Sequence, residues 1–240
     1  MPLSAARVLL HPPKRYCLSF NGENDYVSGS YALDLKTITI LMWVKHLEYE
    51  GENWIFMWAG GRRQFGYPYW GTSTSVKLCF NCETTEGWKA VVSNPQPADL
   101  GTWHQVGVIY SDETKYLGFI LDGKIFHETT YPYTLAERSG VWQINTGVGG
   151  IKALRGFISL TLVYDRILSA SEARHDYLNP MSPVTDGLVL WLKMEEGSGN
   201  IVHDYSGYGN DGTIYGASWT EITHDPVRTL SPLRILSPVR

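Results

Sequence analysis

The sequence predicts an all-β fold, a sandwich or a barrel, from three observations. Residues 37–44 alternate with period two and are fairly apolar on both faces, as in a strand buried between layers. Short segments of this kind recur along the chain and are separated by Gly, Asn and Pro turns. Asp122-Gly123 between two such segments is typical of the type I′ turn of a β-hairpin.

The remaining elements follow from the same patterns. Further predicted strands are Tyr16–Phe20, Trp54–Trp58, Val76–Asn81, Lys89–Ser93, Trp103–Tyr110, Tyr116–Leu121, Lys124–His127, Val141–Asn145 and Phe157–Tyr164. A single helix is predicted, because Ser169 and Glu172 have the spacing of a capping box. It runs to about Leu178, where Asn179-Pro180 stops it.

Composition excludes several classes of protein. The chain has 240 residues, 43% of them apolar, which is enough for a sizeable core. Its net charge of −4 offers no basic field for nucleic acid. No apolar run approaches the roughly 18 residues of a membrane span, and the short apolar N-terminal stretch, interrupted by Arg7, does not resemble a secretory leader. Three cysteines, an odd number, argue against a disulfide framework.

The C-terminal tail carries a seven-residue echo. Arg228–Arg234 reads RTLSPLR and Arg234–Arg240 reads RILSPVR, with three Arg and no acid after Asp225. Proline favours extended chain and removes a backbone donor. The tail is therefore predicted either to be disordered or to dock as an arm on a neighbouring subunit.

Three segments together resemble the laminin-G-like jelly-roll family, a relative of pentraxins and concanavalin A-type lectins. They are CLSFNGENDYV at Cys17–Val27 with ITILMWVK after it, WHQVGVIYSDETKYLGFILDGKIF at Trp103–Phe126 with GFISLTLVYDRILSASEA at Gly156–Ala173, and DGLVLWLKMEEGSGNIVHDYSGYGNDGTIYGASW at Asp186–Trp219. The resemblance implies a two-sheet antiparallel jelly-roll sandwich with one short helix near residues 170–178.

The order of these segments departs from the family. Asp186–Trp219 resembles the family's opening segment, which normally precedes the strand matched by Cys17–Val27, but here it follows the predicted helix. With 34 residues, Asp186–Trp219 is too short to bury its own core. Three explanations stay open: it completes its own sandwich by circular permutation, it completes a neighbouring subunit, or it begins a truncated second domain. The predicted organisation is an extension over 1–15, one jelly roll over 16–219 completed by 186–219, and an arm over 220–240.

The resemblance also implies a structural calcium ion. Calcium prefers carboxylate and carbonyl oxygens. The expected ligands come from two loops that the resemblance places side by side; they are Asp204, Asn210, Asp211, Asn21, Asn24 and Asp25. Asn21 and Ser159 stand where the family has or often has Asp, which lowers the negative charge. The alternative is a metal-free turn held by Asx hydrogen bonds.

A candidate ligand-binding loop lies at residues 60–75. Aromatic residues are 13% of the chain, more than a core requires. Aromatic rings stack on sugars, and Arg donates hydrogen bonds to hydroxyls or carboxylates. The candidate residues are Arg62, Arg63, Tyr67, Tyr69 and Trp70. Because the same residue types are enriched in subunit interfaces, a protein partner stays open beside sugar.

Catalysis is not predicted. Glu48, Glu50 and Glu52 alternate by two, as do the carboxylates of related jelly-roll glycosidases. However, Gly51 interrupts them, and they read as a solvated loop after a strand. No GxSxG elbow is present.

The leading expectation is a non-catalytic structural or recognition module, a virion or surface-assembly protein. It would contact copies of itself or other structural proteins in a virion or at a cell surface. The alternative is a calcium-dependent carbohydrate-binding, lectin-like domain with glycan partners. A glycoside-active enzyme is third.

Overall fold

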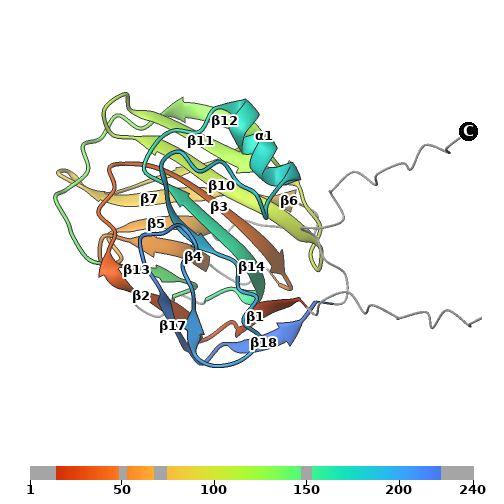
Figure 1. Cartoon of the computed structure of the whole chain (residues 1–240). Helices are drawn as coiled ribbons and strands as arrows, with labels where there is room; N and C mark the ends of the chain where they lie inside the picture. Colours follow the sequence, from red (N-terminus) through yellow and green to blue (C-terminus); the bar gives the residue numbers. More distant parts are fainter. Residues whose placement is uncertain (1–14, 49–52, 68–74, 147–152, 223–240) are drawn as a thin grey trace, which may run out of the picture.

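The computed structural model describes residues 15–48, 53–67, 75–146 and 153–222, which form two antiparallel β-sheets packed face to face (Figure 1). Sheet A contains, in spatial order, β12 (Lys124–Thr130), β11 (Tyr116–Leu121), β10 (Trp103–Ser111), β3 (Thr37–His46), β14 (Arg155–Tyr164), β1 (Tyr16–Asn21) and β18 (Ser218–Glu221), and β15 (Leu188–Leu192) also pairs with β14.

Sheet B contains, in spatial order, β16 (Ile201–Val202), β17 (Gly212–Tyr215), β2 (Tyr26–Ala32), β13 (Val141–Ile144), β4 (Asn53–Trp58), β5 (Arg63–Tyr67), β7 (Cys79–Thr84) and β8 (Gly87–Val92). Two short strands, β6 (Ser75–Val76) and β9 (Gln96–Pro97), pair apart from both sheets. The prediction of an all-β, two-sheet antiparallel sandwich is confirmed.

The main core lies between the sheets, where alternate residues of each strand meet. Ile38 and Ile40 of β3 face Phe65 and Phe80 of sheet B within one cluster of buried side chains. The hairpin at β11–β12 has its predicted turn, because Asp122 and Gly123 have φ of 48° and 72°. The predicted strand over Val76–Asn81 is instead divided between β6 and β7.

The predicted helix is confirmed as α1 (Ala170–Leu178). Ser169 is its N-cap, and Ser169 and Glu172 form the capping box. The helix lies against the outer face of sheet A (Figure 1), where Tyr177 stacks on Trp43 with ring centroids 5.4 Å apart. Tyr164 donates a 2.5 Å hydrogen bond to Asp176, and both side chains are buried. The helix is thus anchored to the sheet by packing and by a buried hydrogen bond.

The sequence did not predict β2, because Ser-Gly-Ser at its centre has low strand propensity. The structure explains the glycine. A Cβ at Gly29 would lie 2.2 Å from Nε1 of Trp142, and one at Gly212 would lie 2.7 Å from the same indole. Both strands therefore need glycine so that the buried Trp142 can pack across them.

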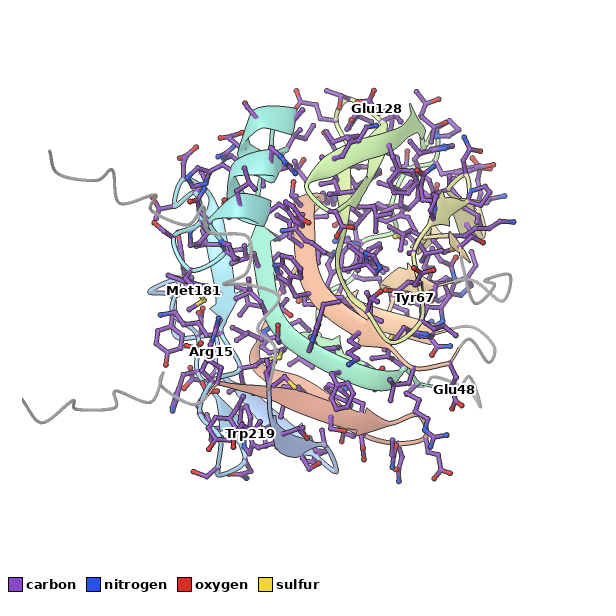
Figure 2. All side chains as sticks on the ribbon, turned by 90° about the vertical axis from the view of Figure 1, so that its right-hand side faces the viewer. Arg15, Glu48, Tyr67, Glu128, Met181 and Trp219 are labelled. Atoms are coloured by element: carbon purple, nitrogen blue, oxygen red, sulfur yellow. The ribbon has the colours of Figure 1, made fainter. Side chains whose placement is uncertain are left out.

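The segment after the helix pairs with strands of its own chain in both sheets. β15 and β18 join sheet A, and β16 and β17 join sheet B. Its buried side chains Leu190, Leu192 and Ile214 belong to the main core. Arg15 ties the start of the described chain to it through a 2.5 Å ion pair with Glu195 and a 3.2 Å contact to Met181 Sδ (Figure 2).

The pairing of β18 with β1 continues to Glu221, and the amide of Ile222 donates to the carbonyl of Arg15 at 2.8 Å. Strand pairing thus reaches past residue 219, the boundary expected from the sequence. The full division into extension, jelly roll and arm stays a prediction, because residues 1–14 and 223–240 lie outside the described residues. None of the described helices is long and apolar enough to span a membrane.

Candidate functional site

The outer face of sheet B presents polar side chains. Residues that pair directly across an antiparallel sheet point to the same face, so strand registers identify which side chains lie together. One row crosses all eight strands of the sheet: Ile201, Thr213, Ser28, Gln143, Met57, Gln64, Asn81 and Ala90. The adjacent row, through Phe56, Phe65 and Phe80, lies in the core. The row with the amide and hydroxyl side chains is therefore the outward one.

At the β7–β8 edge this polar row meets an exposed tryptophan. Trp88 is 45% exposed and pairs directly with Glu83, which places both side chains on the outer face. Arg138 clasps the Glu83 carboxylate with hydrogen bonds of 2.7 and 3.0 Å. Arg62 lies 3.8 Å from the same carboxylate. Together with Asn81 they form the Trp88 patch: Trp88, Glu83, Arg138, Arg62 and Asn81.

The Trp88 patch combines an aromatic surface with fixed donors and acceptors. Asn81 Nδ2 donates to Gln64 Oε1 at 3.2 Å, and Gln64 Nε2 donates to the carbonyl of Gly61 at 3.1 Å, so the amides are oriented. The hydrogen bonds from Arg138 hold the pKa of the Glu83 carboxyl below its usual value. Glu83 is therefore ionised at neutral pH, an acceptor and not a proton donor.

Most other exposed aromatic rings are already in contact with a neighbour. Lys193 Nζ lies 3.9 Å from the ring centroid of Tyr205 and 4.3 Å from that of Trp191. Tyr215 stacks on Tyr26 with centroids 4.6 Å apart. Tyr208, 67% exposed, lies in the loop before β17. Trp88 differs from these rings because it lies beside a carboxylate that is held by two arginines.

The predicted ligand loop is divided by the fold. Arg62 is exposed and belongs to the Trp88 patch. Tyr69 and Trp70 lie outside the described residues. Arg63 and Tyr67 were expected to contact ligand, and this is wrong, because both are buried in the sandwich, with exposures of 0% and 5%.

Arg63 is a structural residue. Its guanidinium donates to the carbonyls of Leu35 and Ala136 at 2.7 and 3.3 Å and lies 3.0 Å from Asp34. These partners satisfy most of a buried charge that would otherwise be strongly destabilising. The period of the strand could have indicated this, since Arg63 shares its face with Phe65 and Tyr67, both in the core.

The predicted calcium loop is held by its own hydrogen bonds. Asp204 Oδ1 accepts from the amides of Trp191 and Ser206, both at 2.9 Å, and Oδ2 accepts from Ser206 Oγ at 2.8 Å and the Asn210 amide at 2.9 Å. Asp211 accepts from the Asp204 amide at 2.8 Å and contacts His203 Nδ1 at 3.0 Å. The carboxylate oxygens of Asp204 are thus directed at protein donors.

The other expected calcium ligands, in the Asn21–Asp25 loop, do not lie beside those in the Asp204–Asp211 loop. The register of β2 and β17 pairs Tyr26 with Tyr215 and Gly29 with Gly212. Asp25 and Asp211 therefore lie at opposite ends of this strand pair, on the order of 16 Å apart at the usual rise per residue. The expectation that the two loops lie side by side is wrong.

The Asn21–Asp25 loop forms its own turn. Asn21 Oδ1 accepts from the amides of Glu23 and Asn24 at 2.8 and 3.3 Å, and Asp25 Oδ2 accepts from the Asn21 amide at 2.8 Å. Among the described residues, no cluster of three or more His, Cys, Asp or Glu side chains has the geometry of a metal site. These two loops therefore do not fit a single shared ion.

Of the acidic series Glu48, Glu50 and Glu52, the structure describes Glu48. Glu48 forms an ion pair of 3.1 Å with Arg155 at the end of sheet A. Glu50 and Glu52 lie outside the described residues. Cys79 and Cys82 are buried on β7 and are not joined in a disulfide, and burial raises the pKa of Cys82.

The structure thus defines a two-sheet jelly roll with a polar outer face. The chain belongs to the concanavalin A-like lectin/glucanases superfamily, whose laminin G-type family model matches residues 21–174. The match ends within α1, so β15–β18 lie beyond it. No curated protein matches the sequence at a significant level.

Three solved structures share the fold. A protein from Bacteroides ovatus, described as a candidate carbohydrate binding protein, is 15% identical with a TM-score of 0.66; the match covers 88% of this chain and 61% of that one. The chain therefore spans about three fifths of its length. A heptameric SAP-like pentraxin from Limulus polyphemus is 14% identical, with a TM-score of 0.56 and coverage of 68% and 82%.

The third structure is domain 4 of AbnA, an extracellular arabinanase from Geobacillus stearothermophilus, in complex with arabinotriose. It is 12% identical, with a TM-score of 0.52 and coverage of 66% and 75%. At these identities the three structures establish the shared fold.

Proposed function

We propose that this chain is a non-catalytic carbohydrate-binding module that recognises glycans through the Trp88 patch. The observation that carries the proposal is an exposed tryptophan on a sheet face, paired with an ionised glutamate and flanked by two arginines. A sugar ring offers C–H groups to an aromatic face and hydroxyls to charged and amide groups.

Two comparisons support carbohydrate as the ligand class. The superfamily is described by lectins and glucanases, and two proteins of the same fold are described as a candidate carbohydrate binding protein and as a domain in complex with arabinotriose. None of the three structures reported above is a virion component. The assembly role expected first from the sequence therefore becomes the second candidate, favoured by the heptameric state of the structurally similar pentraxin.

The experiment is a glycan array with the full chain, followed by calorimetric titration of the strongest oligosaccharide. Trp88→Ala should weaken binding at least about tenfold, as expected for the central aromatic residue of a binding site. Val92→Ala is the matched control, because Val92 is 40% exposed on the same face of the same strand. It should leave affinity within about twofold.

Two outcomes would contradict the proposal. One is the absence of saturable glycan binding by folded protein, and the other is equal affinity of Trp88→Ala and wild type. Analytical sedimentation of the same protein tests the second candidate, an assembly role, because that role requires a stable oligomer. Release of reducing sugar from a bound oligosaccharide would contradict the non-catalytic assignment and return the glycoside-active alternative.

A further inference from the structure

The outer face of sheet A has a pocket that the proposed function does not use. Its volume is about 260 Å³, and it is lined by Cys17, Lys45, Trp103, Phe157, Thr220, Glu221 and Ile222. Trp219, labelled in Figure 2, lies on β18, the edge strand that also carries Thr220 and Glu221 of this pocket. At 260 Å³ the pocket lies just below the usual range for drug-sized ligands, a size suited to one ring.

Strand registers build the floor of this pocket. Trp103 of β10 pairs with Lys45 of β3, Lys45 pairs with Phe157 of β14, and Phe157 pairs with Ser19 of β1. These side chains therefore share the outer face of sheet A. The two aromatic rings lean toward each other over the intervening lysine, with centroids 6.4 Å apart and planes at 47°.

Lys45 supplies a positive charge between the rings. Its Nζ lies 5.8 Å from the centroid of Phe157. Within the part of the chain that the structure describes, Lys45 has no ion-pair partner, whereas the nearby Arg155 is paired with Glu48 at 3.1 Å. Cys17 does not neutralise Lys45, because burial raises the pKa of this thiol to about 12 and keeps it uncharged.

We propose that this pocket is a second binding site, specific for a sugar ring that carries a carboxylate, such as a hexuronate. Trp103 and Phe157 contact the ring, and Lys45 pairs with the carboxylate. A hydrogen bond between two charged groups is roughly twice as strong as one between neutral groups. The site is separate from the Trp88 patch, on the opposite sheet, and does not depend on it.

Glu221 sets the direction in which the ligand can bind. This exposed residue lies on the edge strand β18 and lines the same pocket, so its charge opposes an anion. The carboxylate of the sugar must therefore point to Lys45 and away from Glu221. It follows that Lys45 and Glu221 have opposite effects on the preference for acidic over neutral sugars.

The test uses two ligands that differ only at C6, methyl β-glucuronide and methyl β-glucoside, titrated into the full chain by NMR. The glucuronide should bind about tenfold more tightly, as expected for one charge-assisted contact. Lys45→Met keeps the aliphatic stem and removes the charge, so it should abolish this preference while leaving glucoside affinity within about twofold. Glu221→Gln should increase the preference, and higher salt should reduce it.

Equal affinity for the two ligands, a preference that survives Lys45→Met, or no saturable glucuronide binding by folded protein would overturn the proposal. Trp88→Ala is the control that separates the two sites, because it should weaken glycan binding at sheet B and leave the glucuronide preference unchanged. A glucuronide preference lost in Trp88→Ala would also count against a second site.

Discussion

The outer faces of the two sheets differ in chemistry although both belong to one antiparallel sandwich. The outer face of sheet A carries a second apolar cluster, in which Leu41, Trp43 and Leu162 pack beneath helix α1. The outer face of sheet B carries the polar row and the Trp88 patch, beside a smaller buried cluster of Trp54, Met57 and Cys79. Helix α1 covers the apolar cluster on the outer face of sheet A, whereas the outer face of sheet B presents amide, hydroxyl and charged groups.

This difference separates stability from recognition. An apolar face must be covered, so substitutions there are expected to change the free energy of unfolding. The exposed polar positions of sheet B have little burial energy to lose, so substitutions at these positions are expected to change binding instead. The pocket at Lys45 lies on the outer face of sheet A beside the apolar cluster under α1, so both stability and binding are relevant there.

The largest expected effect is on the covered face. Leu162→Ala should lower the free energy of unfolding by about 2–5 kcal/mol, because it leaves a cavity in a fully buried cluster. Thr213→Ala on the outer face of sheet B is the comparison and should change it by less than about 0.5 kcal/mol. Urea unfolding measures both. Similar losses for the two variants would remove the distinction between the faces.

The interior shared by both sheets has a pH signature of its own. Burial lowers the pKa of His46 from 6.5 to about 4, with a hydrogen bond to Asn53 opposing the shift. Since the unfolded chain takes up this proton first, stability is full above pH 6.5 and falls as the pH drops toward 4, by roughly 3 kcal/mol at most. Urea midpoints across that window should show the fall, and His46→Gln should flatten it. An unchanged slope in His46→Gln would show that His46 is not the cause.

The smallest expected effect is that of metal removal. The Asp204 carboxylate accepts four hydrogen bonds from its own loop and from the Trp191 amide, so the loop is closed by protein donors. Chelation by EDTA is therefore expected to leave the melting temperature unchanged. A drop on chelation, reversed by added calcium, would restore the calcium site as a proposal.

Local sequence patterns predicted individual strands and the helix better than they predicted which strands lie side by side. The helix was predictable because a capping box and a proline define its ends within a few residues. The β11–β12 hairpin was predictable because Asp122-Gly123 adopts the positive φ angles that this turn requires. In both the capping box and the hairpin turn, the interacting residues lie within a few positions of each other in the sequence.

The site depended on long-range pairing. Trp88 faces Glu83 across the short β7–β8 hairpin, but nothing local indicates that Arg138 and Arg62 will reach the same carboxylate. Arg62 and Arg63 are neighbours in sequence, yet one is exposed and the other is buried against carbonyls of Leu35 and Ala136. Arg63 begins β5 with its side chain toward the core, whereas Arg62 lies in the preceding turn.

The sequence by itself determined the all-β class, the helix and the jelly-roll family. Period-two patterns, turn residues and caps act over a few residues and need no tertiary information. The tertiary structure alone decided which strands became neighbours, and with them the polar row, the Trp88 patch and the pocket at Lys45. The physical reason is that a β-sheet face is assembled across strands, so its chemistry depends on registers between residues far apart in the chain.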